Sequence, residues 1–100
     1  MKSLVIRKVA EQDLDEASKW YESRRTGLGA EFLLTVETAV ASILAHPEAN
    51  ALVHKNLRRA FIHRFPYGIF YYVEEPRIVI VGVIHSSRSP RIWKRRLSQN

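Results

Sequence analysis

Two consecutive segments near the end of the chain are apolar at almost every position, and they constrain the fold more than any other feature. Residues 69–73 read Ile-Phe-Tyr-Tyr-Val, and residues 77–85 read Arg-Ile-Val-Ile-Val-Gly-Val-Ile-His. A strand that is apolar on both alternating faces is typical of the centre of a sheet that is covered on each side. Glu74-Glu75-Pro76 lies between the segments and predicts a turn. We therefore expect two central strands joined by this turn.

The first half of the chain predicts a short strand followed by a helical hairpin. Leu4-Val5-Ile6 is typical of a strand, and Thr26-Gly27-Leu28-Gly29 interrupts two periodic segments. The second segment should end at His46-Pro47, because the residue before a proline is disfavoured in the helical region. Asp13 lies off the first apolar stripe and is expected to face water. The two stripes are Ala10, Leu14, Ala17 and Tyr21, then Phe32, Leu33, Val36, Val40, Ile43 and Leu44.

The remaining segments provide little to cover the second face of the sheet. Residues 48–56 lack periodicity and predict a loop, residues 59–65 predict a strand, and Phe65-Pro66-Tyr67-Gly68 predicts a turn. Residues 90–100, with Trp93 at helical spacing from Leu97, are either a short helix or a flexible arm. Because the helical hairpin covers only one face, we expect a partner to complete the core on the other.

Composition limits the chain to a small set of classes. One hundred residues allow one domain, residues 1–100, and 46% apolar with 26% charged residues predicts a folded chain. The longest apolar run, Ile78 to Ile84, is too short to cross a bilayer, and the first residues lack the apolar core of a signal peptide. Zero cysteines exclude disulfides, thiolate zinc sites and cysteine nucleophiles. We expect a cytoplasmic protein without membrane association.

The charge is unevenly distributed along the sequence. The net charge is +6, eight of the ten acidic residues fall between residues 11 and 48, and the only acids after residue 54 are Glu74 and Glu75. A basic half predicts an anionic partner, either a nucleic acid or an acidic protein segment. The four histidines lie far apart in sequence, and neither a phosphate-binding glycine loop nor a nucleophile motif is present. We therefore predict no metal and no cofactor.

Several fragments in a fixed order resemble the ParE/RelE toxin superfamily of type II toxin–antitoxin systems, whose members are also called plasmid stabilisation proteins. The similarity extends over essentially the whole chain. The fragments are Asp13-Leu14 with Ala17, Trp20 and Tyr21; Gly27-Leu28-Gly29 with Glu31-Phe32-Leu33; Ile43 with Pro47; Arg58-Arg59; Phe65-Pro66-Tyr67 with Ile69 and Tyr71; and Val83 with His85, Arg88, Pro90, Trp93 and Arg96.

The resemblance implies an α+β fold of β-α-α-β-β-β order, with an antiparallel meander packed on the helical hairpin. It also implies a cognate antitoxin whose carboxyl-terminal segment folds across the toxin. For the assembly, a homodimer and a heterotetramer with the antitoxin are the two alternatives. An acidic amphipathic segment of that kind would bury apolar surface and pair with arginines on the basic half.

The resemblance divides the activity into alternatives. A ParE-like protein poisons DNA gyrase without being a catalyst, and the pattern of Arg88, Pro90, Trp93 and Arg96 favours this branch. A RelE-like protein cleaves messenger RNA on the ribosome and needs an acid–base set with cations. RelE-like nucleases commonly have a tyrosine near the carboxyl terminus, and this chain lacks it, since no tyrosine follows Tyr72. A third alternative is a non-toxic binding or regulatory module.

Each alternative has its own candidate residues. The residues for a nuclease are Arg58, Arg64, His85 and Arg88, where His85 is either the acid or base or a structural residue at a strand end. Trp93 is either an anchor in a partner or part of the core, whereas Trp20 and Tyr21 are expected to pack the helix on the sheet. Arg58 and Arg59 should point to opposite faces of their strand. The residues expected to bind the target or the antitoxin are Arg59, Arg64, Arg88, Arg91, Trp93, Arg95 and Arg96.

Overall fold

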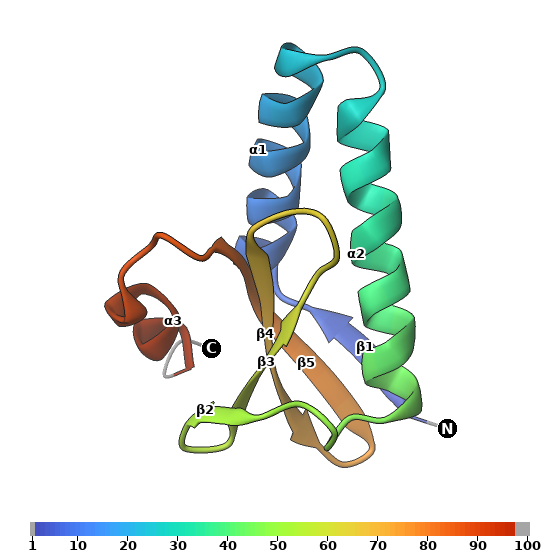
Figure 1. The fold of residues 1–100 in the computed structure, drawn as a ribbon. Helices are drawn as coiled ribbons and strands as arrows, with labels where there is room; N and C mark the ends of the chain where they lie inside the picture. Colours follow the sequence, from blue (N-terminus) through green and yellow to red (C-terminus); the bar gives the residue numbers. More distant parts are fainter. Residues whose placement is uncertain (1, 98–100) are drawn as a thin grey trace.

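The computed structural model describes residues 2–97 and has an α+β fold, as predicted (Figure 1). One five-stranded sheet carries a helical hairpin against one face and a short helix against the other. The order of strands across the sheet is β1-β5-β4-β3-β2. In chain order the elements are β1 (Ser3–Ile6), α1 (Lys8–Arg24), α2 (Leu28–Ala45), β2 (Leu52–His54), β3 (Leu57–Phe61), β4 (Tyr67–Glu74), β5 (Arg77–His85) and α3 (Pro90–Leu97).

The two apolar segments form the paired strands β4 and β5, and β5 has a neighbour on each side. β4 is antiparallel to β5, whereas β1 pairs with β5 in parallel and ends at Ile6, opposite Ile80. Phe70 lies opposite Gly82 but Tyr71 lies opposite Ile80, so Val81 is an extra residue in β5. This β-bulge bends the strand just beyond the point where β1 ends.

The main core lies between the helical hairpin and the sheet, and it confirms most of the predicted helical stripes. Ala10, Phe32 and Ile43 have no exposed surface, and Leu14, Tyr21 and Val40 pack against the same cluster. Leu33 and Leu44 were placed on the stripe but are 40% and 36% exposed. Both residues lie at the edges of the α2 stripe, where the helix surface begins to face water.

The second face of the sheet is covered by the chain itself, so the expectation that a partner completes the core is wrong. Residues 90–97 form helix α3 rather than a flexible arm, and the last three residues of the predicted segment, 98–100, lie outside the described residues. Trp93 stacks on Phe70, with ring centroids 5.0 Å apart, and only 8% of its surface is exposed. Ile92 and Leu97 pack against the same cluster. One amphipathic helix of eight residues is enough to cover the centre of this face, because the large Trp93 ring packs on it.

The segment predicted as a loop over residues 48–56 contains a strand. Leu52–His54 forms β2, a three-residue edge strand paired with Leu57 and Arg58 of β3. Three residues are too few to show a period of two, so the sequence carried no signal for β2. The predicted strand over residues 59–65 is also shifted, because β3 covers Leu57–Phe61.

Helix α2 has an exposed apolar outer face. Leu34 is 61% exposed, and by length and composition Leu28–Ala45 is the single described helix that could cross a membrane. The core helix of a folded protein passes the same test, and α2 packs along α1 with Phe32, Val36 and Ile43 buried. The prediction of no membrane association, which considered only Ile78 to Ile84, stays a prediction.

Two glycines shape the turn of the helical hairpin. Gly27 has φ of 89°, in the left-handed region that favours glycine. The Glu22 carboxylate accepts hydrogen bonds from the backbone N–H of Gly27 at 2.9 Å and of Gly29 at 3.0 Å, and so caps the start of α2. At Gly29 the two helices nearly touch, since an added Cβ would lie 2.5 Å from the backbone oxygen of Ser18.

Replacing Gly29 with alanine should therefore destabilise the fold. We expect a loss of about 1–3 kcal/mol from overpacking against α1, although alanine is the better helix former. Urea unfolding followed by circular dichroism measures this change. Ala30→Gly, at the exposed neighbouring position, isolates helix propensity alone. A Gly29→Ala variant as stable as the parent would contradict the close approach of the two helices.

Candidate functional site

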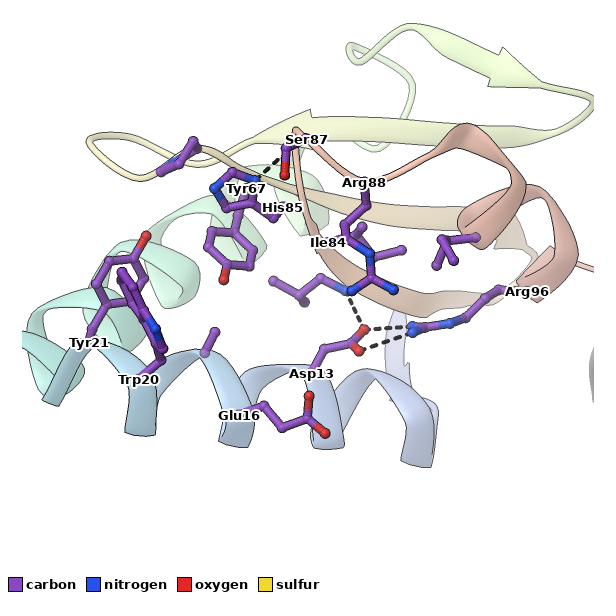
Figure 2. A pocket seen from close by; sticks show the side chains of 14 residues that line it. Asp13, Glu16, Trp20, Tyr21, Tyr67, Ile84, His85, Ser87, Arg88 and Arg96 are labelled. Atoms are coloured by element: carbon purple, nitrogen blue, oxygen red, sulfur yellow. Dashed lines mark hydrogen bonds and ion pairs between the residues drawn. The ribbon is translucent and has the colours of Figure 1, made fainter. Parts of the chain in front are cut away.

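A cleft of about 580 Å³ lies between α1 and the end of β5, and three of the predicted site residues line it. Figure 2 shows Asp13 and Glu16 on the α1 side, with His85 and Arg88 across from them. Trp20, Tyr21 and Tyr67 form an aromatic end, and Arg96 reaches in from α3 at the other end. The cleft joins groups from the first helix, the last strand and the last helix.

The floor of the polar end is a bidentate ion pair between Asp13 and Arg96. The Arg96 Nη1–H and Nη2–H groups donate to Asp13 Oδ2 at 2.6 Å and Oδ1 at 3.1 Å. Both side chains are only 15% exposed, so the prediction that Asp13 faces water is wrong. Asp13 also accepts from the backbone N–H of Val83 at 2.9 Å, and Arg96 donates to the carbonyl of Val81 at 3.2 Å.

The end of β1 explains this position of the ion pair. β1 ends opposite Ile80, so the edge of β5 continues past it without a strand neighbour. Buried backbone groups need partners, and the two charged side chains supply them at Val81 and Val83. Gly82 leaves room for the contact, because an added Cβ would lie 2.9 Å from Arg96 Nη1. The ion pair therefore attaches α3 and α1 to the bulged part of β5.

His85 is held by its neighbours at the end of β5. Its Nδ1 accepts a hydrogen bond from the backbone N–H of Ser87 at 3.0 Å, and its ring meets Tyr67 edge-on at 5.1 Å. In the neutral ring the proton therefore sits on Nε2. This geometry fits the structural interpretation of His85, a strand-end residue bonded to its neighbours.

The two tyrosines of the cleft are kept in the neutral form. Burial raises the pKa of Tyr21. Burial also raises the pKa of Tyr67, with smaller contributions from Tyr21 and Asp13, while the positive charge of Arg88 acts in the opposite direction. A phenol whose pKa lies above its usual value stays protonated at neutral pH, so it can donate a hydrogen bond or a proton but does not act as a base.

The four residues proposed for a nuclease do not come together. Only His85 and Arg88 line the cleft. The Arg58 guanidinium donates to the carbonyls of Asn50 at 2.6 Å and Glu48 at 3.2 Å, and so fixes the segment before β2.

Arg64 lies in the turn after β3 and forms an ion pair with an acidic residue of α2. It pairs with Glu31 at 3.0 Å, and Glu31 also contacts Arg25 at 3.2 Å. The hydrogen bond from Arg64, followed by that from Arg25, lowers the pKa of Glu31. Arg64 thus ties the β3–β4 turn to α2, and it does not line the cleft that holds His85 and Arg88.

The residues proposed for partner binding do not form one group in the structure. Arg88 and Arg96 line the cleft, and Arg64 is in the turn. Arg59 pairs in register with Phe70, whereas Arg58 pairs with Tyr71, so the two arginines do point to opposite faces. Arg91 and Arg95 are exposed on the outer side of α3, whereas Trp93 faces inward. For Trp93 the structure shows the core alternative, since its ring is stacked inside the chain.

Sequence reasoning missed or misplaced three side chains. Trp20 was expected to pack on the sheet, but it is 52% exposed, with the Arg24 guanidinium 4.5 Å from its ring. Tyr67 was assigned only to a turn, and it lies against His85. Asp13 lies one position before the buried-stripe residue Leu14, at the margin of that stripe. An acidic residue beside a buried stripe, in a chain whose last residues are rich in arginine, could have indicated a buried ion pair.

Comparisons with known proteins agree with this architecture. The family model described as "ParE toxin of type II toxin-antitoxin system, parDE" matches residues 4–90. The structure is similar to one titled "Chromosomal ParDE TA system from P. aeruginosa", with TM-score 0.73 and 20% identity over 85% of this chain and 96% of that one. It is also similar to the isolated RelE toxin of E. coli, with TM-score 0.60 and 17% identity over 95% of each chain. None of the curated protein sequences matches the chain.

Proposed function

Because the chain belongs to the ParE toxin family of type II toxin–antitoxin systems, we propose that it inhibits bacterial growth by poisoning DNA gyrase and that a cognate antitoxin neutralises it. The observation that supports a non-catalytic poison is the dispersal of the acid–base candidates. Cleavage of RNA needs a base, an acid and cations around one phosphate. Here Arg58 and Arg64 form their contacts elsewhere, and only His85 and Arg88 of the four candidates line the cleft.

An antitoxin partner fits both the family and the distribution of charge. The similar structure from P. aeruginosa is titled as a ParDE toxin–antitoxin system. Most acids of this chain precede residue 49, whereas exposed arginines gather on its last strands and on α3. An acidic segment would neutralise those arginines on binding. We place the toxin in the cytoplasm, where gyrase acts, and leave a homodimer and a heterotetramer with the antitoxin as alternatives.

A messenger RNA nuclease is the second candidate, and one observation favours it. His85 and Arg88 share the cleft with Tyr67, so an imidazole, a cation and a phenol lie together. In this case the free Nε2 of His85 would carry the proton transfer, since Nδ1 is occupied by Ser87. The third alternative, a non-toxic binding module of the same fold, predicts normal growth.

Induction in a bacterium without the antitoxin tests the proposal. We expect loss of colony-forming cells together with an SOS response and gyrase–DNA adducts. Message cuts in phase with codons, detected by primer extension, would replace the gyrase proposal by the nuclease. Unchanged growth at a confirmed protein level would favour the non-toxic module.

Replacing Arg88 with alanine should weaken toxicity by roughly tenfold or more in surviving cells, the effect expected when an arginine at a binding hot spot is lost. Arg88 is exposed, so the melting temperature should stay close to that of the parent. Arg77→Ala is the matched control, since it removes an exposed arginine at the opposite end of β5. An Arg88→Ala variant that kills as efficiently as Arg77→Ala would show that the cleft is not the effector surface.

A further inference from the structure

The face of the sheet beside α3 carries an exposed aromatic ring with an arginine lying on it. Phe61, the last residue of β3, is 67% exposed. The Arg59 guanidinium carbon lies 4.5 Å from the centroid of the Phe61 ring, within the range of a cation–π contact. Both residues are on the same side of β3, because they are two positions apart. We call this pair the Arg59–Phe61 platform.

Strand β4, beside the platform, leaves room for the Arg59 side chain to lie flat on the sheet. Gly68 of β4 lies opposite Phe61 in register, and an added Cβ there would lie 3.0 Å from both Cγ and Cδ of Arg59. The arginine stem therefore crosses the sheet where a side chain is missing. The buried Nε of Arg59 has no hydrogen-bond acceptor within residues 2–97, and no described acid forms an ion pair with this side chain. The Arg59 guanidinium is positioned by stacking on Phe61, and no described acidic residue neutralises its charge.

Helix α3 extends this positive surface. Arg59 lies opposite Phe70, and Trp93 stacks on Phe70, so the platform borders α3 directly. The Lys94 Nζ lies 5.8 Å from the Trp93 ring, and Arg91, Lys94 and Arg95 are exposed on the outer side of the helix. Neither residues 57–73 nor residues 77–97 contain an aspartate or glutamate. The platform and α3 therefore form one surface without acids of their own.

We propose that this surface binds single-stranded nucleic acid. One side of the Phe61 ring is covered by Arg59, and its exposed remainder offers a flat apolar face on which a base can stack. The cations of α3 then lie where the phosphates of the same strand would pass. An acidic segment such as that of the proposed antitoxin would neutralise the same cations, but the exposed ring favours a ligand in which planar bases alternate with phosphates. Binding at this surface goes beyond the gyrase proposal, which names no contact between the toxin and nucleic acid.

Fluorescence anisotropy with labelled 15-nucleotide oligothymidine and oligouridine tests the proposal on the full chain. We expect Phe61→Leu, which keeps an apolar side chain but removes the ring, to raise Kd at least about fivefold for the strand that binds. Its salt dependence should stay that of the parent. Arg59→Gln should also raise Kd and should reduce the slope of log K against log salt by about 0.7, the value for one lost phosphate contact.

A matched pair on α1 provides the control. Arg24 lies on the exposed ring of Trp20 at 4.5 Å, so Arg24→Gln removes the same charge from the same kind of contact elsewhere. It should leave Kd within about twofold, since Arg24 is the last residue of α1, outside the proposed surface, and would make no phosphate contact. Absence of binding to both oligonucleotides at 50 mM salt, or equal losses for Arg24→Gln and Arg59→Gln, would overturn the proposal. So would binding of a labelled Glu/Leu peptide, but not of oligonucleotide, with the same dependence on Phe61. None of these three results changes the growth and SOS measurements, so the two proposals fail separately.

Discussion

Replacing Val81 with aspartate should leave the chain unfolded. Val81 has no exposed surface and lies in the cluster between β5 and α3, beside Phe70 and Trp93. Burying an unpaired carboxylate costs several kcal/mol, which is comparable with the whole stability of a small domain, about 5–15 kcal/mol. The Arg96 guanidinium, the nearest cation to the Val81 carbonyl, is already bound to Asp13. We expect loss of the far-ultraviolet circular dichroism signal of helix and strand, with no cooperative thermal transition.

Leu34→Asp is the matched control for this prediction. Leu34 is 61% exposed on α2, so the same change from an apolar residue to aspartate should alter stability by less than about 1 kcal/mol. A soluble, cooperatively folding Val81→Asp protein would show that the face under α3 is open to water, and the assignment of α3 as its cover would then be wrong.

Breaking the Asp13–Arg96 ion pair should be the next most damaging change. Both groups are 15% exposed, and removal of one partner leaves the other charged, buried and unpaired. The expected loss for Asp13→Ala is about 3–5 kcal/mol, because the N–H of Val83 also loses its acceptor. For a domain of this length each kcal/mol corresponds to roughly 4–8 °C in Tm. Differential scanning calorimetry of parent and variant measures the shift.

A double-mutant cycle separates the ion pair from general packing. Asp13→Ala with Arg96→Leu should be less destabilised than the sum of the single variants, because neither charge is then left alone. Losses that simply add would contradict a coupled pair. Arg96 is therefore a partly buried charge whose replacement affects the fold, whereas Arg88 is an exposed charge whose replacement should cost little stability.

The fold class followed from the sequence because its signals are local and repeated. The periodic apolar residues of α1 and α2 predicted a buried stripe on each helix, and Ala10, Phe32 and Ile43 are fully buried there. The apolar faces of residues 69–73 and 77–85 predicted central strands, and β5 is paired on both sides. β2 was missed because three residues at an edge have no pattern to read.

The candidate site was predicted only in part. The carboxyl-terminal arginines and His85 carried a recognisable pattern, but whether each side chain faces a cleft, a turn or the core depends on contacts across the chain. Asp13 and Arg96 are 83 residues apart in sequence and meet where β1 ends. Arg64 forms an ion pair with Glu31, and the Trp93 ring stacks on Phe70.

The sequence by itself determined most of the helices and strands, although neither β2 nor α3, together with the basic character of the chain and the residue types available for chemistry. Only the tertiary structure decided which of those residues are free. Periodicity records which side of an element is apolar, because that property is local. Neutralisation of a charge or covering of a ring depends on groups distant in sequence, which meet only when the whole chain has packed.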